Sequence, residues 1–395
     1  MNELHEGARF LISNYVFPND LHVHWSMMIV LYPYLSGLVD GAFIVAALYY
    51  VFGIESLKPI ARFSLVFALA ILLCAMTPLL LHLGRPERNL NMMITPSPSS
   101  AMAGAGYIYS VVLVVLGLIV VLLYRPELVR RRLETRGAEQ LFYRALTLDS
   151  TNLSPEALAL DAKLVKWLAA IGIPVATVFH GYVGFLFGGV KANPSWSTPL
   201  MPVIFLFSAC VSGISAIVLA YVVIKTVTQQ SINVRCLRTL INTLSGFFVL
   251  AFSFEMLEVF SHAYLKSGYH HMVEGLLNGP LYSSFWEWQV GFCSIVPLFL
   301  LGWLVLFKVK NHVYPLLAAV VSFILLLQVL FMRWNVVIGG QLMSKSARGY
   351  TEFHPEWFDK EGILAVIVVM AIPFVLLFVL SKIFPLWQEE EASRV

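Results

Sequence analysis

Long apolar stretches follow one another along almost the whole chain, separated by short polar segments. Each is long enough to cross a bilayer as a helix, which takes about 20 residues. The nine stretches cover residues 26–52, 61–83, 101–124, 164–188, 200–225, 239–266, 282–307, 314–338 and 362–384. Strands of a membrane barrel would be about half as long and would alternate in polarity. The pattern therefore predicts one all-α membrane domain over residues 1–395, a bundle of about nine transmembrane helices.

The composition indicates the same class of protein. Hydrophobic residues make up 59% of the chain and charged residues only 12%, whereas about 25% of residues are charged in soluble domains. Residues 1–24 lack a basic start followed by an apolar run, so we expect no cleavable signal peptide. The four cysteines are scattered without a CxxC pair, which predicts neither a disulfide framework nor an iron–sulfur ligand set.

The basic residues predict the orientation of the bundle. Most of the 26 Lys and Arg fall on the side that carries residues 125–163, so the positive-inside rule makes this segment a long cytoplasmic loop. Within it, Ser154-Pro155-Glu156 is typical of a helix start. The N-terminus is then outside the cell membrane and the C-terminus cytoplasmic. Segments 84–100, 189–199, 266–280 and 339–362 lie on the outer side, and their Gly, Pro and aromatic residues favour a docking face there.

Four carboxylates lie inside the apolar stretches: Asp40, Glu255, Glu258 and Glu287. An ionised carboxylate in hydrocarbon costs about 3 kcal/mol or more, so such groups usually face a bundle interior or a wet cavity. Glu255 and Glu258 are three residues apart and share nearly one helix face, so at least one is expected to hold a proton. Asp40 lies about 22 Å from the outer end of its helix. It either forms part of a proton path or bonds to a neighbouring Ser or Thr.

The remaining ionisable groups of the spans gather toward the outer side, and this arrangement suits a quinone. A quinone needs an apolar slot, a donor for each carbonyl oxygen and a group that exchanges protons. We expect the catalytic proton chemistry at Glu258, Glu255 and Asp40. The quinone-binding candidates are His180, Tyr182, Trp286, Glu287, Arg333, His24 and Trp25. Structural roles remain open for His180, as a neutral side chain bonded to a neighbouring helix, and for Glu258, as a pair with Arg333 or Arg85.

Two other functions remain open at this point. A b-type haem needs two histidines on facing helices at matching depth, but His180 is the only histidine well inside a span. A proton-coupled permease often has broken helices and inverted repeats. Pro33, Gly37 and Pro174 are candidate breaks, but no repeat is evident.

Several motifs resemble one known family. LLLHLGRPERNLNMM (79–93) resembles the LGRPxR signature of the polysulfide reductase membrane subunit family (NrfD/PsrC), and HWSMMIVLYPYLSGLVDGAFIVAAL resembles its first helix. FEMLEVF, SSFWEWQVGF and RWNVVIGGQ resemble the long branch that includes the hydrogenase subunit HybB and the sulfite-reduction subunit DsrP. The chain departs from this pattern in two ways: it has nine spans rather than ten, and His82 stands where many relatives have a carboxylate.

The resemblance implies a quinone-reactive membrane anchor that binds neither haem nor an iron–sulfur cluster itself. Such a subunit exchanges electrons between the quinone or menaquinone pool and a ferredoxin-like iron–sulfur subunit on the outer face. That partner connects to a catalytic molybdopterin, hydrogenase or cytochrome subunit of anaerobic respiration. In this picture His180 is a quinone ligand, Arg85 orients a loop or the quinone, and Glu258 exchanges protons.

Overall fold

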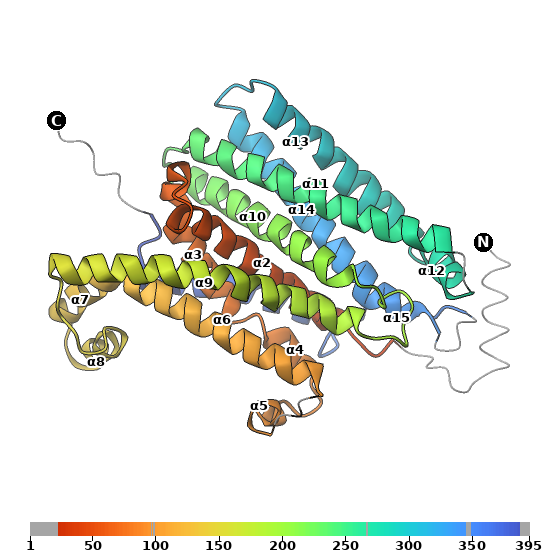
Figure 1. Cartoon of the computed structure of the whole chain (residues 1–395), viewed down its shortest axis with the longest axis horizontal. Helices are drawn as coiled ribbons and strands as arrows, with labels where there is room; N and C mark the ends of the chain where they lie inside the picture. Colours follow the sequence, from red (N-terminus) through yellow and green to blue (C-terminus); the bar gives the residue numbers. More distant parts are fainter. Residues whose placement is uncertain (1–22, 96, 98, 266–267, 345–348, 388–395) are drawn as a thin grey trace.

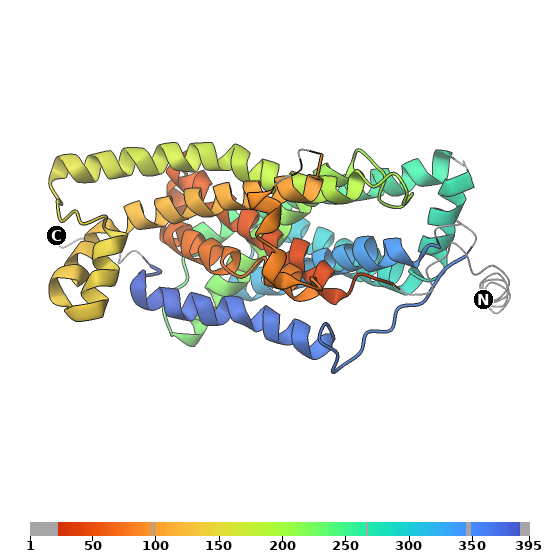
Figure 2. The ribbon, with the colours of Figure 1, turned by 90° about the horizontal axis from the view of Figure 1, so that it is seen from below.

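The chain folds into a bundle of long helices that run along one axis of the molecule (Figures 1 and 2). The structure is a computed structural model that describes residues 23–95, 97, 99–265, 268–344 and 349–387. Within these ranges nine helices are long and apolar enough to cross a membrane, and no strand is found. The predicted all-α membrane fold is therefore confirmed. The predictions for residues 1–22 and for both chain ends lie outside the described residues.

The spans are built from continuous and composite helices. Five are single α-helices: α2 (Met27–Tyr50), α6 (Ala101–Leu123), α9 (Pro155–Gly188), α10 (Met201–Val227) and α16 (Ile363–Ile383). A sixth, α11, runs over Val234–Leu265. The others join shorter pieces: α3 (Lys58–Leu72) with α4 (Thr77–His82), the π-helical η3 (Ser283–Ile295) with α13 (Val296–Leu306), and α14 (Tyr314–Trp334) with the π-helical η4 (Asn335–Gly339) and α15 (Gly340–Leu342).

The two ends of the bundle differ, and we name them by what they carry. The long-loop face carries α5 (Asn91–Ile94), the segment 189–200, α12 (Gly268–Asn278) and the segment 349–362. The arginine-rich face, at the opposite end in Figure 1, carries α7 (Arg125–Glu134) and α8 (Gly137–Leu146). Short 3-10 turns lie at either end, η1 (Glu55–Leu57) and η2 (Pro86–Arg88).

Most of the segment 125–163, predicted as a long loop between the third and fourth spans, is helical. Besides α7 and α8, the fourth span already begins at Pro155, where the Ser154 hydroxyl accepts a hydrogen bond from the Ala157 N–H at 3.3 Å. Arg125 fixes the segment to α9 through Asp161, at 2.9 and 3.0 Å. Arg144 and Arg132 donate to Asp149 and hold its pKa below the usual range. A search for apolar stretches misses such short, polar helices.

Helix α2 lies at the centre of the bundle and is buried over nearly its whole length. It crosses α10 where two glycines meet: a Cβ on Gly41 would lie 2.6 Å from the Gly213 Cα and 2.6 Å from the Ala209 carbonyl oxygen. Gly37, one turn earlier, faces His180 of α9, whose Cε1 would lie 3.2 Å from an added Cβ. Small residues at such crossings let membrane helices approach to backbone contact. This packing places α9 and α10 directly against α2.

Candidate functional site

A pocket opens between α10, α11, α12 and the two π-helical segments, toward the long-loop face. Its free volume is about 100 Å³. Glu255, Glu258 and His262 of α11 line one wall, since spacings of three and four residues place them on one helix face. We call it the Glu255 pocket; the other lining residues are Ser195, Met201, Ile204, Val259, Val273, Leu276, Leu277, Leu281, Phe285, Gln289, Met332, Asn335 and Val336.

Neutral amides hold the Glu255 carboxylate at the bottom of this wall. Gln289 donates to Oε2 at 3.1 Å, and Gln328 donates to Oε2 at 3.0 Å and to Oε1 at 3.3 Å. The Asn335 amide in turn donates to the side-chain oxygen Oε1 of Gln289 at 2.8 Å and accepts from the Ser284 hydroxyl at 2.6 Å. Buried polar groups need such partners. The network therefore keeps a carboxylate that is only 5% exposed in a fixed position.

Both amides next to the pocket come from π-helical backbone. Gln289 lies in η3, which extends over 13 residues, and Asn335 begins η4. π-Helical turns are rare and occur frequently at functional sites. The Ser294 hydroxyl donates to the backbone carbonyl oxygen of Gln289 at 2.7 Å, across five residues. Because a π turn holds more residues than an α turn, it changes which side chains face the pocket.

Glu258 begins a row of polar groups that leads toward the surface. Its Oε2 accepts a hydrogen bond from the Thr198 hydroxyl at 2.9 Å, and its Oε1 lies 3.2 Å from His262 Nε2. Nδ1 of His262 lies 2.9 Å from Nδ1 of His270, on α12. A hydrogen bond between two imidazole nitrogens needs one donor and one acceptor, so at least one ring is neutral. Partial burial, followed by the nearby His262, holds the pKa of His270 below its usual value.

A second polar cluster lies fully buried around Arg333 of α14. Its Nη2 lies 2.9 Å from His180 Nε2 and donates to the Ser208 hydroxyl at 2.9 Å. The guanidinium carbon lies 3.8 Å from the centre of the Phe205 ring, a cation–π contact. Because Arg stays protonated and has no acceptor, Nε2 of His180 must accept and its Nδ1 must carry the proton.

That Nδ1 proton faces Asp40 of α2. His180 Nδ1 lies 3.5 Å from Asp40 Oδ2, which is longer than a normal hydrogen bond. Arg333, His180 and Asp40 are each 0% exposed, and among the described residues neither Asp40 oxygen has a hydrogen-bond partner. His180 thus stands between a buried cation and a buried carboxylate. We call Arg333, His180, Asp40, Ser208 and Phe205 the Arg333 cluster.

The comparisons with known proteins agree with this membrane fold. The sequence model of the NrfD polysulphide reductase family matches residues 17–345. The chain belongs to the NrfD family. This confirms the resemblance expected from its motifs, and with the nine spans it makes the chain an integral, multi-pass membrane protein.

Three NrfD-type relatives show how wide the similarity is. The selenate reductase C subunit of Mesobacillus selenatarsenatis is 28% identical over 367 residues, 88% of this chain and 83% of that protein. A putative membrane subunit of the dimethyl sulfoxide reductase of Halobacterium salinarum is 26% identical over 70% of this chain and 61% of its own length. The Hdr-like menaquinol oxidoreductase integral membrane subunit of Archaeoglobus fulgidus is 20% identical over 67% of this chain and 58% of its own length.

The structure brings some of the residues singled out in this NrfD-family sequence together and separates others. Glu255 and Glu258 line one pocket, while His180, Arg333 and Asp40 form another cluster. The rest lie outside both groups. Tyr182 donates a hydrogen bond to the Ala101 carbonyl oxygen, and Trp286 donates one to Asn278. Glu287 is exposed and accepts a hydrogen bond from Ser283. The Trp25 ring stacks on the Trp196 ring with 5.0 Å between their centres, and Arg85 and His24 are exposed.

Sequence reasoning also missed several polar residues of the NrfD-family pocket. Gln289, Gln328 and Asn335 hold or extend the Glu255 network, and His262 and Thr198 bind Glu258. A prediction that starts from ionisable side chains does not single out neutral amides such as these. Amide side chains inside apolar spans are a usable signal, since each needs a buried partner.

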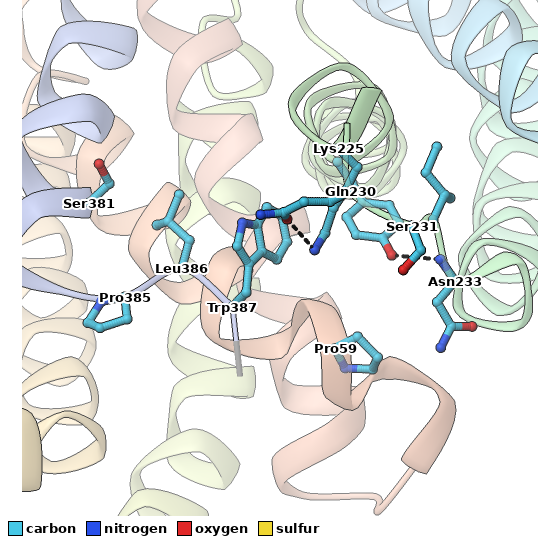
Figure 3. A pocket seen from close by; sticks show the side chains of 11 residues that line it. Pro59, Lys225, Gln230, Ser231, Asn233, Ser381, Pro385, Leu386 and Trp387 are labelled. Carbon is cyan, nitrogen blue, oxygen red and sulfur yellow. Dashed lines mark hydrogen bonds between the residues drawn. The ribbon is translucent and has the colours of Figure 1, made fainter. Parts of the chain in front are cut away.

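A larger pocket at the arginine-rich face has different chemistry. It has a free volume of about 760 Å³, and Figure 3 shows Lys225, Gln230 and Trp387 around it. Lys225 donates to Gln230 at 2.8 Å and lies 4.4 Å from the centre of the Trp387 ring. No Asp, Glu or His is among its described lining residues, so they include no carboxylate or imidazole for proton exchange. Nor is any group of three or more His, Cys, Asp and Glu placed to hold a metal within the described ranges.

Proposed function

We propose that this chain is the quinone-reactive membrane anchor of a multi-subunit respiratory oxidoreductase, and that the quinone ring binds in the Glu255 pocket. One observation carries the proposal: a buried carboxylate held by neutral amides lies in an apolar pocket whose upper wall, at Glu258 and His262, leads to the surface. This combination offers a slot for a ring and a group that exchanges its protons.

The lining of the pocket suits a quinone ring. Leu277, Phe285 and Val336 supply apolar walls, while the amides of Gln289 and Asn335 are candidate partners for the carbonyl oxygens. The free volume of about 100 Å³ is below the roughly 300–1,000 Å³ of common ligand pockets. Binding therefore requires side chains to move. Two methionines in the wall, Met201 and Met332, are flexible enough to do so.

The proposed reaction is quinol oxidation or its reverse. Oxidation of a quinol releases two electrons and two protons. Glu258 would accept a proton at the pocket, and the electrons would pass directly to the nearest iron–sulfur cluster of a partner protein, because we propose no redox cofactor within this chain. Such direct transfer needs a short path. The pocket opens toward the long-loop face, next to α12, which is where we place the partner.

The names of the relatives support such an assembly. They are called subunits of a selenate reductase and a dimethyl sulfoxide reductase and of a menaquinol oxidoreductase. We propose menaquinone or another quinone as the substrate and a ferredoxin-like iron–sulfur subunit on the long-loop face, joined to a molybdopterin, hydrogenase or cytochrome subunit. In the cytoplasmic membrane this face is the outer one, with the N-terminus outside and the C-terminus cytoplasmic, because the arginine-rich face obeys the positive-inside rule.

A binding measurement tests the pocket. A fluorescent quinone analogue of the hydroxyquinoline N-oxide class should be quenched when it binds the purified protein. Leu277→Trp, which fills the pocket, should abolish this quenching, whereas Glu287→Gln, on the exposed side of η3, should leave it unchanged. Equal quenching by Leu277→Trp and the unaltered protein would contradict the proposed site. A haem Soret band in the same preparation would contradict the proposed anchor type.

A further inference from the structure

Three side chains form a continuous row from the Glu255 pocket to the surface of the long-loop face. Glu258 and His262 line the pocket, and His270 stands on α12, outside the spans. The two separations along the row are 3.2 Å, from Glu258 Oε1 to His262 Nε2, and 2.9 Å, between the Nδ1 atoms of the two histidines. Both are short enough for proton transfer along hydrogen bonds.

We propose that Glu258, His262 and His270 form a proton relay between the Glu255 pocket and water. The relay rests on the proposed quinone function, which it extends by naming the route of the protons. His262 is its central member, because it uses both ring nitrogens, one toward the pocket and one toward the surface.

Each transfer balances. The two quinol hydroxyls give their protons one after the other to the Glu258 carboxylate, while the two electrons leave for the iron–sulfur partner. Protonated Glu258 passes this proton to Nε2 of His262, and His262 passes its Nδ1 proton to Nδ1 of His270. His270 then releases its Nε2 proton to water, so each ring gains one proton and loses one. Both rings return to their first tautomers before the second proton passes. Quinone reduction would use the same row in reverse.

The surroundings of the row keep it aligned. Thr198 occupies Oε2 of Glu258 and leaves Oε1 for His262. The low pKa of His270, caused by partial burial and then by the neighbouring His262, favours release of a proton from the last ring at neutral pH. The next histidine, His271, points elsewhere: its Nδ1 lies 3.9 Å from Glu274 and its side chain is 63% exposed. His271 is therefore a matched control, one residue away but outside the row.

The test uses membranes that contain the complete complex, with a soluble naphthoquinol as donor and ferricyanide as acceptor, and subtracts the direct reaction of these reagents measured with membranes that lack the complex. His262→Gln should lower turnover by about 10²-fold, as expected for loss of a proton-transfer group. His270→Gln should lower it about tenfold, because water partly replaces a surface group, and added imidazole should restore its rate. His271→Gln should behave like the unaltered complex, with or without imidazole.

The outcomes separate the relay from the quinone site. Quenching of the quinone analogue should be the same in His270→Gln as in the unaltered protein, since His270 does not line the pocket. If the unaltered complex binds the analogue and turns over, but His262→Gln and His270→Gln turn over as fast, the relay is overturned while the quinone site stands. A slow His270→Gln that imidazole does not accelerate also overturns it. If the unaltered protein binds no analogue, both proposals fail.

Discussion

The Glu255 pocket and the Arg333 cluster both hold charged side chains inside the bundle, but their partners differ in kind. Glu255 is bonded to neutral amides, and free space lies beside it. Arg333 is bonded to a histidine and a hydroxyl, and behind that histidine Asp40 is fully buried. In the pocket, the charge of the Glu255 carboxylate can change when it binds a proton. In the cluster, a buried cation and a buried carboxyl group lie on the two sides of one imidazole.

Because of this difference, substitutions in the two regions should affect different properties, stability in one and turnover in the other. Removing one charge of a buried pair leaves the other uncompensated, which costs more than the pair itself contributes. Replacing a carboxylate among amides by another amide leaves hydrogen bonding nearly intact, but removes the titratable group. We therefore expect substitutions in the Arg333 cluster to unfold the protein and those in the Glu255 pocket to inactivate it.

The largest effect is expected for Arg333→Gln. It removes the buried cation on the far side of His180 from Asp40, together with its hydrogen bonds to His180 and Ser208, which should lower the free energy of unfolding by about 3–5 kcal/mol. Thermal unfolding in detergent would measure the loss. The matched control is the double variant Asp40→Asn with Arg333→Gln, which should regain part of this stability. If the double variant is less stable than Arg333→Gln alone, the two charges do not compensate one another.

Glu255→Gln should show the opposite behaviour. Turnover should fall about 10²-fold, or about 2.7 kcal/mol in activation free energy, because the carboxylate beside the ring is lost. The unfolding temperature should stay close to that of the unaltered protein, since the amide of Gln328 can turn to present its oxygen to the new side chain. Glu287→Gln, a carboxylate of η3 on the exposed side, should change neither quantity. A stable and fully active Glu255→Gln would remove Glu255 from the reaction.

The packing around the Arg333 cluster gives the next effect. Gly41→Val places atoms where the Gly213 backbone already lies, 2.6 Å from an ideal Cβ, so α2 and α10 must separate. Overpacking of this kind costs about 1–3 kcal/mol. Gly117→Ala is the matched control, because an added Cβ there meets nothing within 4 Å. Unfolding temperatures of both variants would check the difference, and equal values would show that the helix crossing is not tight.

The fold could be predicted because membrane spans are encoded locally. About 20 consecutive apolar residues suffice for a span, and all nine helices contain such a stretch. The side-by-side placement of Glu255 and Glu258 also follows from one helix alone. Short polar helices such as α7 and α8 contain no such stretch, so hydropathy alone does not reveal them.

Contacts between helices were the part that sequence reasoning could not supply. Helical rise places Asp40 about 22 Å from the outer end of its helix, apart from the groups near the outer side, yet its side chain lies 3.5 Å from that of His180, since the ends of two helices need not lie at one level. The sequence predicts Glu287 as a quinone-binding residue, but η3 is π-helical and presents Gln289 to the pocket while Glu287 is exposed. Hydropathy fixes neither the register between helices nor the position of a π segment.

The smallest effect should come from a contact on the long-loop face that belongs to neither cluster. Glu361, just before α16, lies 2.6 Å from Nδ1 of His82 at the end of α4 and accepts a hydrogen bond from Ser26, the N-cap of α2.

Glu361→Gln should lower stability by only about 1 kcal/mol, because the contact is partly exposed and the amide still accepts from Ser26. Turnover and quinone-analogue quenching should not change. Glu356→Gln, an exposed neighbour in the same segment, is the control and should match the unaltered protein in thermal unfolding. A loss of turnover in Glu361→Gln with normal stability would show that the ends of α2, α4 and α16 act on the pocket. The difference between the two clusters would then not account for function.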